Sequence, residues 1–523
     1  MDRTSKPLWT ALLSLALIAC DAAATPSSGA APRDAAPTCV APAEAAGAIA
    51  APSSLEGWAE LAVRGTEDER RSAIASLRAA GPQGLEVFVR VHGAALMAEP
   101  TGAPVGDRPP ASATSGTPSS APMNPLGGPL PGPDLGASRP VFGVGGALLG
   151  VLGVFGVHGV HGREAAPDPA PVDPARARGA AIDAAIDGIC RQHACRYTQL
   201  YWFTDLEAAK AEARASGRPI LSLRLLGDLG DPLSCANSRF FRSILYPAVA
   251  SALRERFVLH WSSERPAPVV TIDFGDGRRL TRTITGNSVH FVLDAEGRPL
   301  DAIPGLLPPG VFMRLLERAA ALEIETRGLD QGGRAARLRE HHQGRLAELE
   351  AAYEIELLAI GLEPSDYEVQ APRPRGRRPA AIEAELLAPS KSRIEGPILG
   401  VLGESEPDPR WPSLWSRLGL RHRVESRLTP ASLKAMNALQ PVDRAMIAAT
   451  EESLSVDGVR NEYELHREIH RWFALDRVRE LEPLTRMIYD ELFLTPASDP
   501  NLGMAPPEVY AALPGGGWTT TRP

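Results

Sequence analysis

Cysteine and histidine side chains are the groups in this sequence whose types and spacing could do chemistry. The chain has 523 residues and five cysteines, which are too few for a disulfide scaffold in a chain of this length. Cys190 and Cys195 lie close together in the stretch CRQHAC. This spacing predicts a structural disulfide between a helix end and its exit turn. Unpaired burial and a metal site with His193 are the alternatives, although two sulfurs and one nitrogen leave the tetrahedron of zinc incomplete.

A carboxylate and two imidazoles recur every four residues in the segment NEYELHREIH, at Glu462, His466 and His470. On a helix these side chains project from one face, and that arrangement suits a divalent metal ion. The segment lacks the glutamate directly after the first histidine that HExxH metalloproteases use as a base. The pattern therefore supports two hypotheses, a metal site and ordinary hydrogen bonding on or between helices.

The first twenty residues have the layout of an export signal. Pro7 to Ala19 is an uncharged apolar run too short to span a bilayer comfortably. Its end, Leu17-Ile18-Ala19-Cys20, resembles the lipobox of bacterial lipoproteins. The resemblance implies lipidation at Cys20 and a chain held at the bacterial cell envelope by acyl groups. A secretory signal cleaved nearby is the alternative, and the choice between inner and outer membrane stays open.

Composition predicts how the rest of the chain is organised. The net charge of -8 gives no broad basic surface, so nucleic acid is not an expected partner. Stretches rich in alanine, proline, glycine and serine predict disordered segments, because they bury too little apolar surface to offset chain entropy. These are a tether over 21–54 and a linker over 99–178 that contains the apolar glycine-rich run Val141 to Val157. A further linker, rich in proline and arginine, is expected over 363–380. Whether that run touches or spans a membrane is left open.

Hydrophobic periodicity predicts a multidomain α+β protein. A small helical unit is expected over 55–98, a central α/β domain over 179–327, a long helix over 328–362 and a helical C-terminal domain over 381–523. The central domain should hold a mixed sheet with flanking helices. Its expected helices are Leu206 to Ala215 and Val311 to Leu322, and its expected strands are Ile220 to Leu226, Phe257 to Ser262, Val269 to Phe274, Arg279 to Ile284, Val289 to Asp294 and Pro299 to Ile303.

Three stretches of the central domain together resemble the thioredoxin-like superfamily: Ala208 to Leu225, Cys235 to Trp261, and Val289 to Gly305. The chemistry of that family uses a thiolate at a helix N-terminus and a second thiol three residues later, which resolves the mixed disulfide. Cys235 takes the first place and Ser238 the second. The resemblance therefore implies a catalytic role for Cys235 and Ser238 of Cys-x-x-Ser type, which can hold a mixed disulfide but cannot release it internally.

The sequence departs from the family at two further places. Asn287-Ser288 stands where the family's cis-proline is expected, and a hairpin at Gly275 to Gly277 replaces the helix between the middle strands. Three function hypotheses follow. The first is an anchored lipoprotein whose degenerate thioredoxin-like domain serves in binding or scaffolding. The others are a monothiol oxidoreductase or isomerase using Cys235, and a metal-binding helical module using His466 and His470. No cofactor is expected, and the expected partners are a membrane, through the lipid anchor, and other proteins.

Overall fold

The computed structural model describes residues 52–98, 173–284, 286–367, 410–477 and 480–498. The predictions for Cys20, the tether and Val141 to Val157 lie outside these residues. The architecture is α+β, as predicted, with a mixed four-stranded sheet among many helices. Among the described helices, none has the length and apolar character needed to cross a membrane.

The sheet has the strand order β2-β1-β5-β6, and a separate hairpin, β3-β4, is inserted between β2 and β5. Strand β1 pairs in parallel with β2 and antiparallel with β5, and β5 pairs antiparallel with β6. The hairpin turns through Gly275 and Gly277, both at positive φ, where a residue without a Cβ is favoured. The strands are β1 (Ile220–Leu226), β2 (Val258–Arg265), β3 (Val269–Asp273), β4 (Arg279–Thr283), β5 (Ser288–Leu293) and β6 (Pro299–Pro304).

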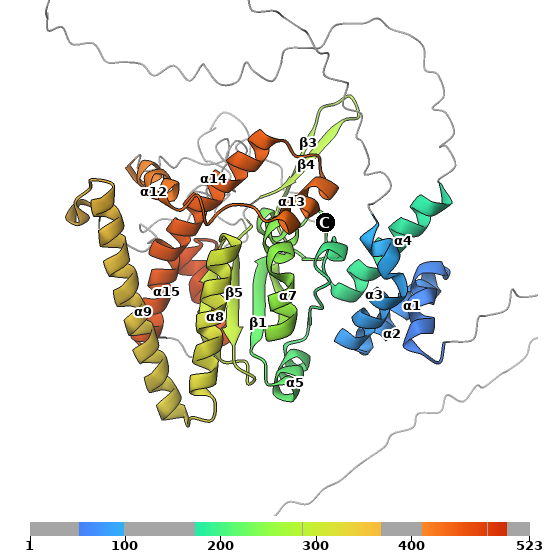
Figure 1. The fold of residues 1–523 in the computed structure, drawn as a ribbon, viewed down its shortest axis with the longest axis horizontal. Helices are drawn as coiled ribbons and strands as arrows, with labels where there is room; N and C mark the ends of the chain where they lie inside the picture. Colours follow the sequence, from blue (N-terminus) through green and yellow to red (C-terminus); the bar gives the residue numbers. More distant parts are fainter. Residues whose placement is uncertain (1–51, 99–172, 285, 368–409, 478–479, 499–523) are drawn as a thin grey trace, which may run out of the picture. The chain divides into compact units, whose positions relative to one another are not determined.

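Both faces of the sheet are buried, because side chains alternate along each strand. In β1, Leu221, Leu223 and Leu225 belong to one core cluster, while Ile220 and Leu226 belong to the other. The first core is filled mainly by two helices that lie in front of β1 and β5 in Figure 1. These helices are α7 (Tyr246–Arg256) and α8 (Pro309–Thr326).

The second face is covered by one helix next to β1 in sequence and by helices from the far end of the chain. Ala209 and Ala213 of α5 pack there with Leu465, Ile469 and Trp472. Buried Arg224 of β1 bonds Glu264 at 3.2 Å and Glu482 at 2.7 Å. The helices on this face are α5 (Leu206–Ser216), the π-helical turn η4 (Asn461–His466), α15 (Arg467–Ala474), α16 (Leu481–Met487) and the π-helical turn η5 (Ile488–Leu492).

A third core is purely helical. Its helices, α1 to α4, are coloured blue to cyan-green in Figure 1. Ile182, Ile186 and Ile189 of α4 pack with Leu77 and Phe88 in this core, although the sequence-based division places them in the sheet domain. The helices are α1 (Leu55–Arg64), α2 (Glu67–Ala79), α3 (Pro82–Met97) and α4 (Pro174–Cys190).

Most of the remaining helices form a smaller core around one long helix. Leu349, Tyr353 and Leu357 of the long helix pack against Trp415 and Val459. The helices of this smaller core are α9 (Gln331–Ala359), α12 (Arg410–Arg421) and α14 (Arg444–Arg460). Helix α13 (Pro430–Leu439) begins after the N-cap Thr429 and contributes Met436 to the first core. The short turns η1 (Cys195–Tyr197), η2 (Phe241–Leu245) and η3 (Pro364–Asp366) complete the described elements, together with α6.

Candidate functional site

Cys235 lies at the start of the short helix α6 (Ala236–Phe240), after the loop that leaves β1. It is the N-cap residue of this helix. Its side chain is 0% exposed and belongs to the first core, the one that α7 and α8 fill. The disulfide found among the described cysteines does not involve it. Cys235 therefore lies at the start of a helix, where the resemblance to the thioredoxin-like superfamily places it, but its thiol is enclosed.

The hydroxyl of Ser238 is directed to the backbone. Ser238 Oγ donates to the carbonyl oxygen of Cys235 at 2.8 Å and is fully buried. Asn237 Nδ2 donates to Ser288 Oγ at 2.7 Å. The side chains of the Cys-x-x-Ser segment therefore tie α6 to its own first turn and to β5.

Gly286 packs directly on Cys235, two residues before β5. A Cβ at position 286 would lie 2.3 Å from Cys235 Cβ and 3.0 Å from its Sγ, and the first of these distances is too short for two carbon atoms. Tyr489 covers the same loop, because its phenol donates to the Asn287 carbonyl at 3.3 Å. No peptide bond between described residues is cis. The thiol is thus enclosed by the main chain of this loop.

Replacing Gly286 with alanine should lower the free energy of unfolding by about 1–3 kcal/mol, because the added methyl group overpacks the contact with Cys235. Urea denaturation followed by circular dichroism measures the change. Gly93→Ala is the matched control, since a Cβ at Gly93 in α3 meets nothing within 4 Å. That control should raise stability by about 0.5–1 kcal/mol. Equal effects of the two substitutions would contradict the close packing at Gly286.

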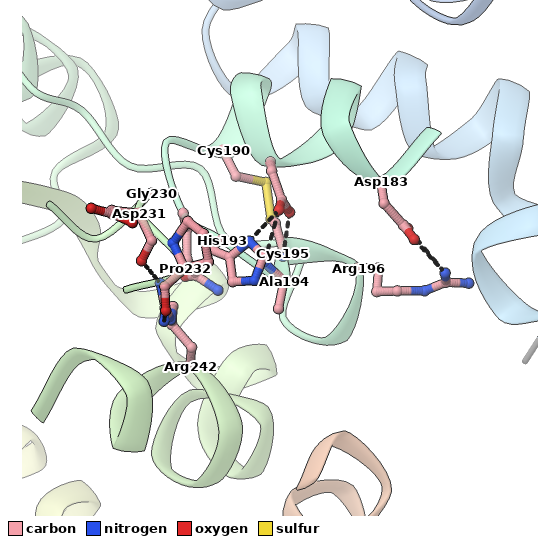
Figure 2. Close-up of polar contacts among 12 residues, drawn as sticks. Asp183, Cys190, His193, Ala194, Cys195, Arg196, Gly230, Asp231, Pro232 and Arg242 are labelled. Carbon is pink, nitrogen blue, oxygen red and sulfur yellow. Dashed lines mark hydrogen bonds and ion pairs between the residues drawn. A yellow bond between two sulfur atoms is a disulfide. The ribbon is translucent and has the colours of Figure 1, made fainter. Parts of the chain in front are cut away.

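A disulfide joins Cys190, at the end of α4, to Cys195, and Figure 2 shows it beside His193 and Ala194. Asp187 accepts hydrogen bonds from the backbone N–H groups of Ala194 at 3.0 Å and Cys195 at 2.8 Å, and its Oδ2 lies 3.0 Å from His193 Nδ1. Both sulfurs belong to the helical core and not to the core that holds Cys235. The disulfide links the end of α4 to the turn that follows it, and His193 pairs with the Asp187 carboxylate.

Arg242 fixes the loop that leads to Cys235. Its guanidinium donates to the carbonyl oxygens of Leu229 at 3.0 Å, Asp231 at 2.6 Å and Pro232 at 3.4 Å (Figure 2). Burial lowers the pKa of Arg242 to about 10, while nearby Cys235 acts in the opposite direction. The side chain is therefore a buried cation at neutral pH, and its hydrogen bonds hold the loop that leads to Cys235.

His466 and His470 lie in a second buried polar cluster, which the sequence analysis recognised only in part. His466 Nε2 lies 2.9 Å from Asp301 Oδ1, and His470 Nδ1 lies 2.7 Å from Nδ1 of His342. All four side chains are 4% exposed or less. Glu462, the third residue of the predicted stripe, is half-buried and is not among the groups brought together.

The cluster combines an ionised carboxylate, that of Asp301, with two neutral rings, those of His342 and His470. Burial acts to raise the pKa of Asp301, but the charge and hydrogen bond of His466 outweigh it, so this pKa lies well below its ordinary value. Burial lowers the pKa of His342 to about 4 and that of His470 well below its ordinary value. Both rings are therefore neutral at pH 7.

Asp301 and His342 were not predicted from the sequence as site residues, because each lies in a separate strand or helix and was not considered together with His466 and His470. Two signals in the sequence could have found them. Asp301 is the one charged residue in the strand PLDAIP, and His342 follows Leu338 by four positions on the buried stripe of α9. An ionisable residue at a core position of a strand or helix needs a polar partner.

A cavity of about 480 Å³ lies beside β2 at the edge of the sheet, and neither Cys235 nor the buried polar cluster opens into it. Its walls come from α3, from Tyr201 and Phe203, and from β2. Arg218 and Arg254, which also line it, already donate to backbone carbonyls at 2.8 Å and 3.0 Å. Cys235 and the four residues of the buried cluster are not among its lining residues.

Comparison of the chain with protein-family models, with curated proteins and with solved structures finds no match.

Proposed function

We propose that this protein is an exported lipoprotein, anchored to a membrane of the bacterial envelope through Cys20, whose thioredoxin-like domain serves in binding or scaffolding and does no thiol chemistry. The order of the sheet, one parallel pair followed by two antiparallel strands, supports the thioredoxin-like assignment. The apolar run that ends at Cys20 supports the anchor.

The observation that carries the proposal is the enclosure of Cys235. A thiol reacts as a thiolate that is reachable by its substrate, and a cysteine buried in apolar surroundings is inert. Cys235 is 0% exposed, and the main chain of Gly286 packs against its side chain. Ser238 supplies no second thiol, and the bridge between Cys190 and Cys195 lies in a different core.

One mass-spectrometry experiment tests both halves of the proposal. Protein extracted from native membranes is treated with iodoacetamide without reduction, before and after unfolding in urea, and the peptides are analysed. We expect acyl groups on Cys20. We also expect Cys235 in the folded protein to be alkylated at least about a hundredfold more slowly than glutathione, because labelling requires local unfolding.

The contrary results are specific. Alkylation of folded Cys235 as fast as glutathione, or mixed disulfides between Cys235 and other proteins, would replace scaffolding by the monothiol oxidoreductase hypothesis. Cys20 without a lipid would remove the anchor and leave the conclusion about Cys235 intact. Unfolded protein must label fully at Cys235, which controls for detection of its peptide.

A further inference from the structure

The buried cluster of one carboxylate and three imidazoles joins four elements from three parts of the chain that are far apart in sequence. Asp301 belongs to β6, His342 to α9, His466 ends η4 and His470 lies in α15. One potential ligand atom from each of Asp301, His342 and His470 lies within 4.8 Å of the other two. Oxygen and imidazole nitrogen at this spacing are a donor set that transition-metal ions bind.

The orientation of His342 exposes one nitrogen to the other members of the cluster. Its Nε2 lies 3.0 Å from the carbonyl oxygen of Leu300, and because a carbonyl only accepts, Nε2 carries the hydrogen. The neutral ring then has its lone pair on Nδ1, the atom that faces His470. A backbone carbonyl that holds the second nitrogen in this way is the usual support of a metal-binding histidine.

Hydrogen bonds alone do not complete the cluster. Without a metal ion, His470 Nδ1 must donate to His342 Nδ1, and His466 Nε2 must donate to Asp301 Oδ1. This leaves His470 Nε2 as a lone pair, and neither it nor His466 Nδ1 has a hydrogen-bond partner among the described residues. Unsatisfied polar atoms in a protein interior are rare, so hydrogen bonds among these residues do not by themselves account for their burial together.

We propose that Asp301, His342 and His470 bind one divalent transition-metal ion of the zinc class, and that His466 holds the Asp301 carboxylate in position. The ion takes the place of the hydrogen between the two Nδ1 atoms, that hydrogen moves to Nε2 of His470 so that the ring stays neutral, and the ion compensates the buried carboxylate charge. The two nitrogens, at 2.7 Å, must separate somewhat, since nitrogens around tetrahedral zinc lie roughly 3.3 Å apart.

The burial of the cluster indicates a structural role for the ion. Three protein ligands leave a fourth tetrahedral position, which an enclosed water molecule would fill here, whereas a catalytic site keeps that position accessible to substrate. All four residues are buried, and the cavity beside the sheet edge does not reach them. The ion would fasten α9 and α15 to β6 and so hold the C-terminal helices on the sheet. This inference is independent of the chemistry of Cys235.

The test uses the full chain, purified without a polyhistidine tag. Metal content is measured by mass spectrometry of the elements, and zinc is then removed with a chelator and returned by titration. We expect one equivalent of zinc per chain and a thermal midpoint that falls on chelation and recovers with zinc. Cobalt in place of zinc should give the visible absorption bands of a protein-bound ion.

Variants separate ligands from neighbours. His342→Gln and His470→Gln should abolish stoichiometric binding, and His466→Gln should weaken it by about 10- to 100-fold, the usual effect of losing a residue that orients a ligand. Glu462→Gln, on the same turn as His466 but outside the cluster, is the matched control and should bind as the unaltered chain does. If a ligand variant fails to fold, the cobalt spectrum of the unaltered chain still decides.

Two outcomes would overturn the proposal. One is metal-free protein whose thermal midpoint does not respond to zinc or cobalt. The other is a folded His470→Gln variant that binds zinc as tightly as the Glu462→Gln control. Either result would leave the cluster as a hydrogen-bonded core network.

Discussion

Replacing Trp472 with alanine is expected to lower the free energy of unfolding of the whole sheet domain by about 3–5 kcal/mol. Trp472 is 1% exposed and shares a core cluster with Val289 and Phe291 of β5. Its truncation leaves a cavity against the sheet, even though the two segments are far apart in sequence. Urea denaturation, followed by far-ultraviolet circular dichroism and by tryptophan fluorescence, measures the loss.

The control lies three residues further on. Leu475, at the C-cap of α15, is 65% exposed, so Leu475→Ala should change stability by no more than about 0.5 kcal/mol. Two separate transitions, of which Trp472→Ala moves only one and leaves the sheet unaffected, would mean that the C-terminal helices fold as a domain of their own. A single shifted transition supports one cooperative unit.

Lowering the pH from 7 to 5 should destabilise the protein through two neutral histidines in the sheet. Burial lowers the pKa of His260 to about 4 and that of His290 to about 3, from an ordinary value of 6.5. Between pH 6.5 and 4 the unfolded chain therefore binds more protons than the folded chain, so stability is fully present above pH 6.5 and falls as the pH drops. Each ring contributes about 2 kcal/mol of loss by pH 5.

A paired substitution isolates one of these rings. His290 Nε2 lies 2.9 Å from the phenol oxygen of Tyr246, so His290→Phe combined with Tyr246→Phe removes the titrating group and its partner while keeping an aromatic ring at each position. The free energy of unfolding of this variant should lose about 2 kcal/mol less between pH 7 and 5 than that of the unaltered chain. An unchanged pH dependence would show that His290 is not held neutral. Other groups titrate equally in both proteins.

Local elements could be predicted from the sequence wherever one short segment carries the whole signal. Strand β1 runs from Ile220 to Leu226, as predicted, because a mostly apolar segment, interrupted only by Ser222 and Arg224, is bounded by Pro219 and Gly227. The long helix predicted over 328–362 is α9, and the hairpin at Gly275 to Gly277 pairs β3 with β4. In each case the physical determinant lies within a few residues of the element.

Packing between elements could not be predicted in the same way, because an apolar face does not specify its partner. Helix α4 precedes the sheet domain in sequence but packs with α1 to α3. The metal-site hypothesis placed Glu462, His466 and His470 together on one helix. In the structure the two histidines instead contact Asp301 and His342, which belong to other elements. The sequence separations of these contacts, 165 and 128 positions, are beyond any helical period.

The salt bridge between Arg224 and Glu482 spans 258 positions of the chain, and this has a consequence for synthesis. A chain emerges from its N-terminus, so β1, β2 and β5 are made long before most of the helices that cover their second face. Helix α5, which precedes β1, covers part of this face, but the rest of the cover comes from residues beyond 460. During that interval the nascent chain presents an apolar sheet face, and its completion depends on protection from aggregation.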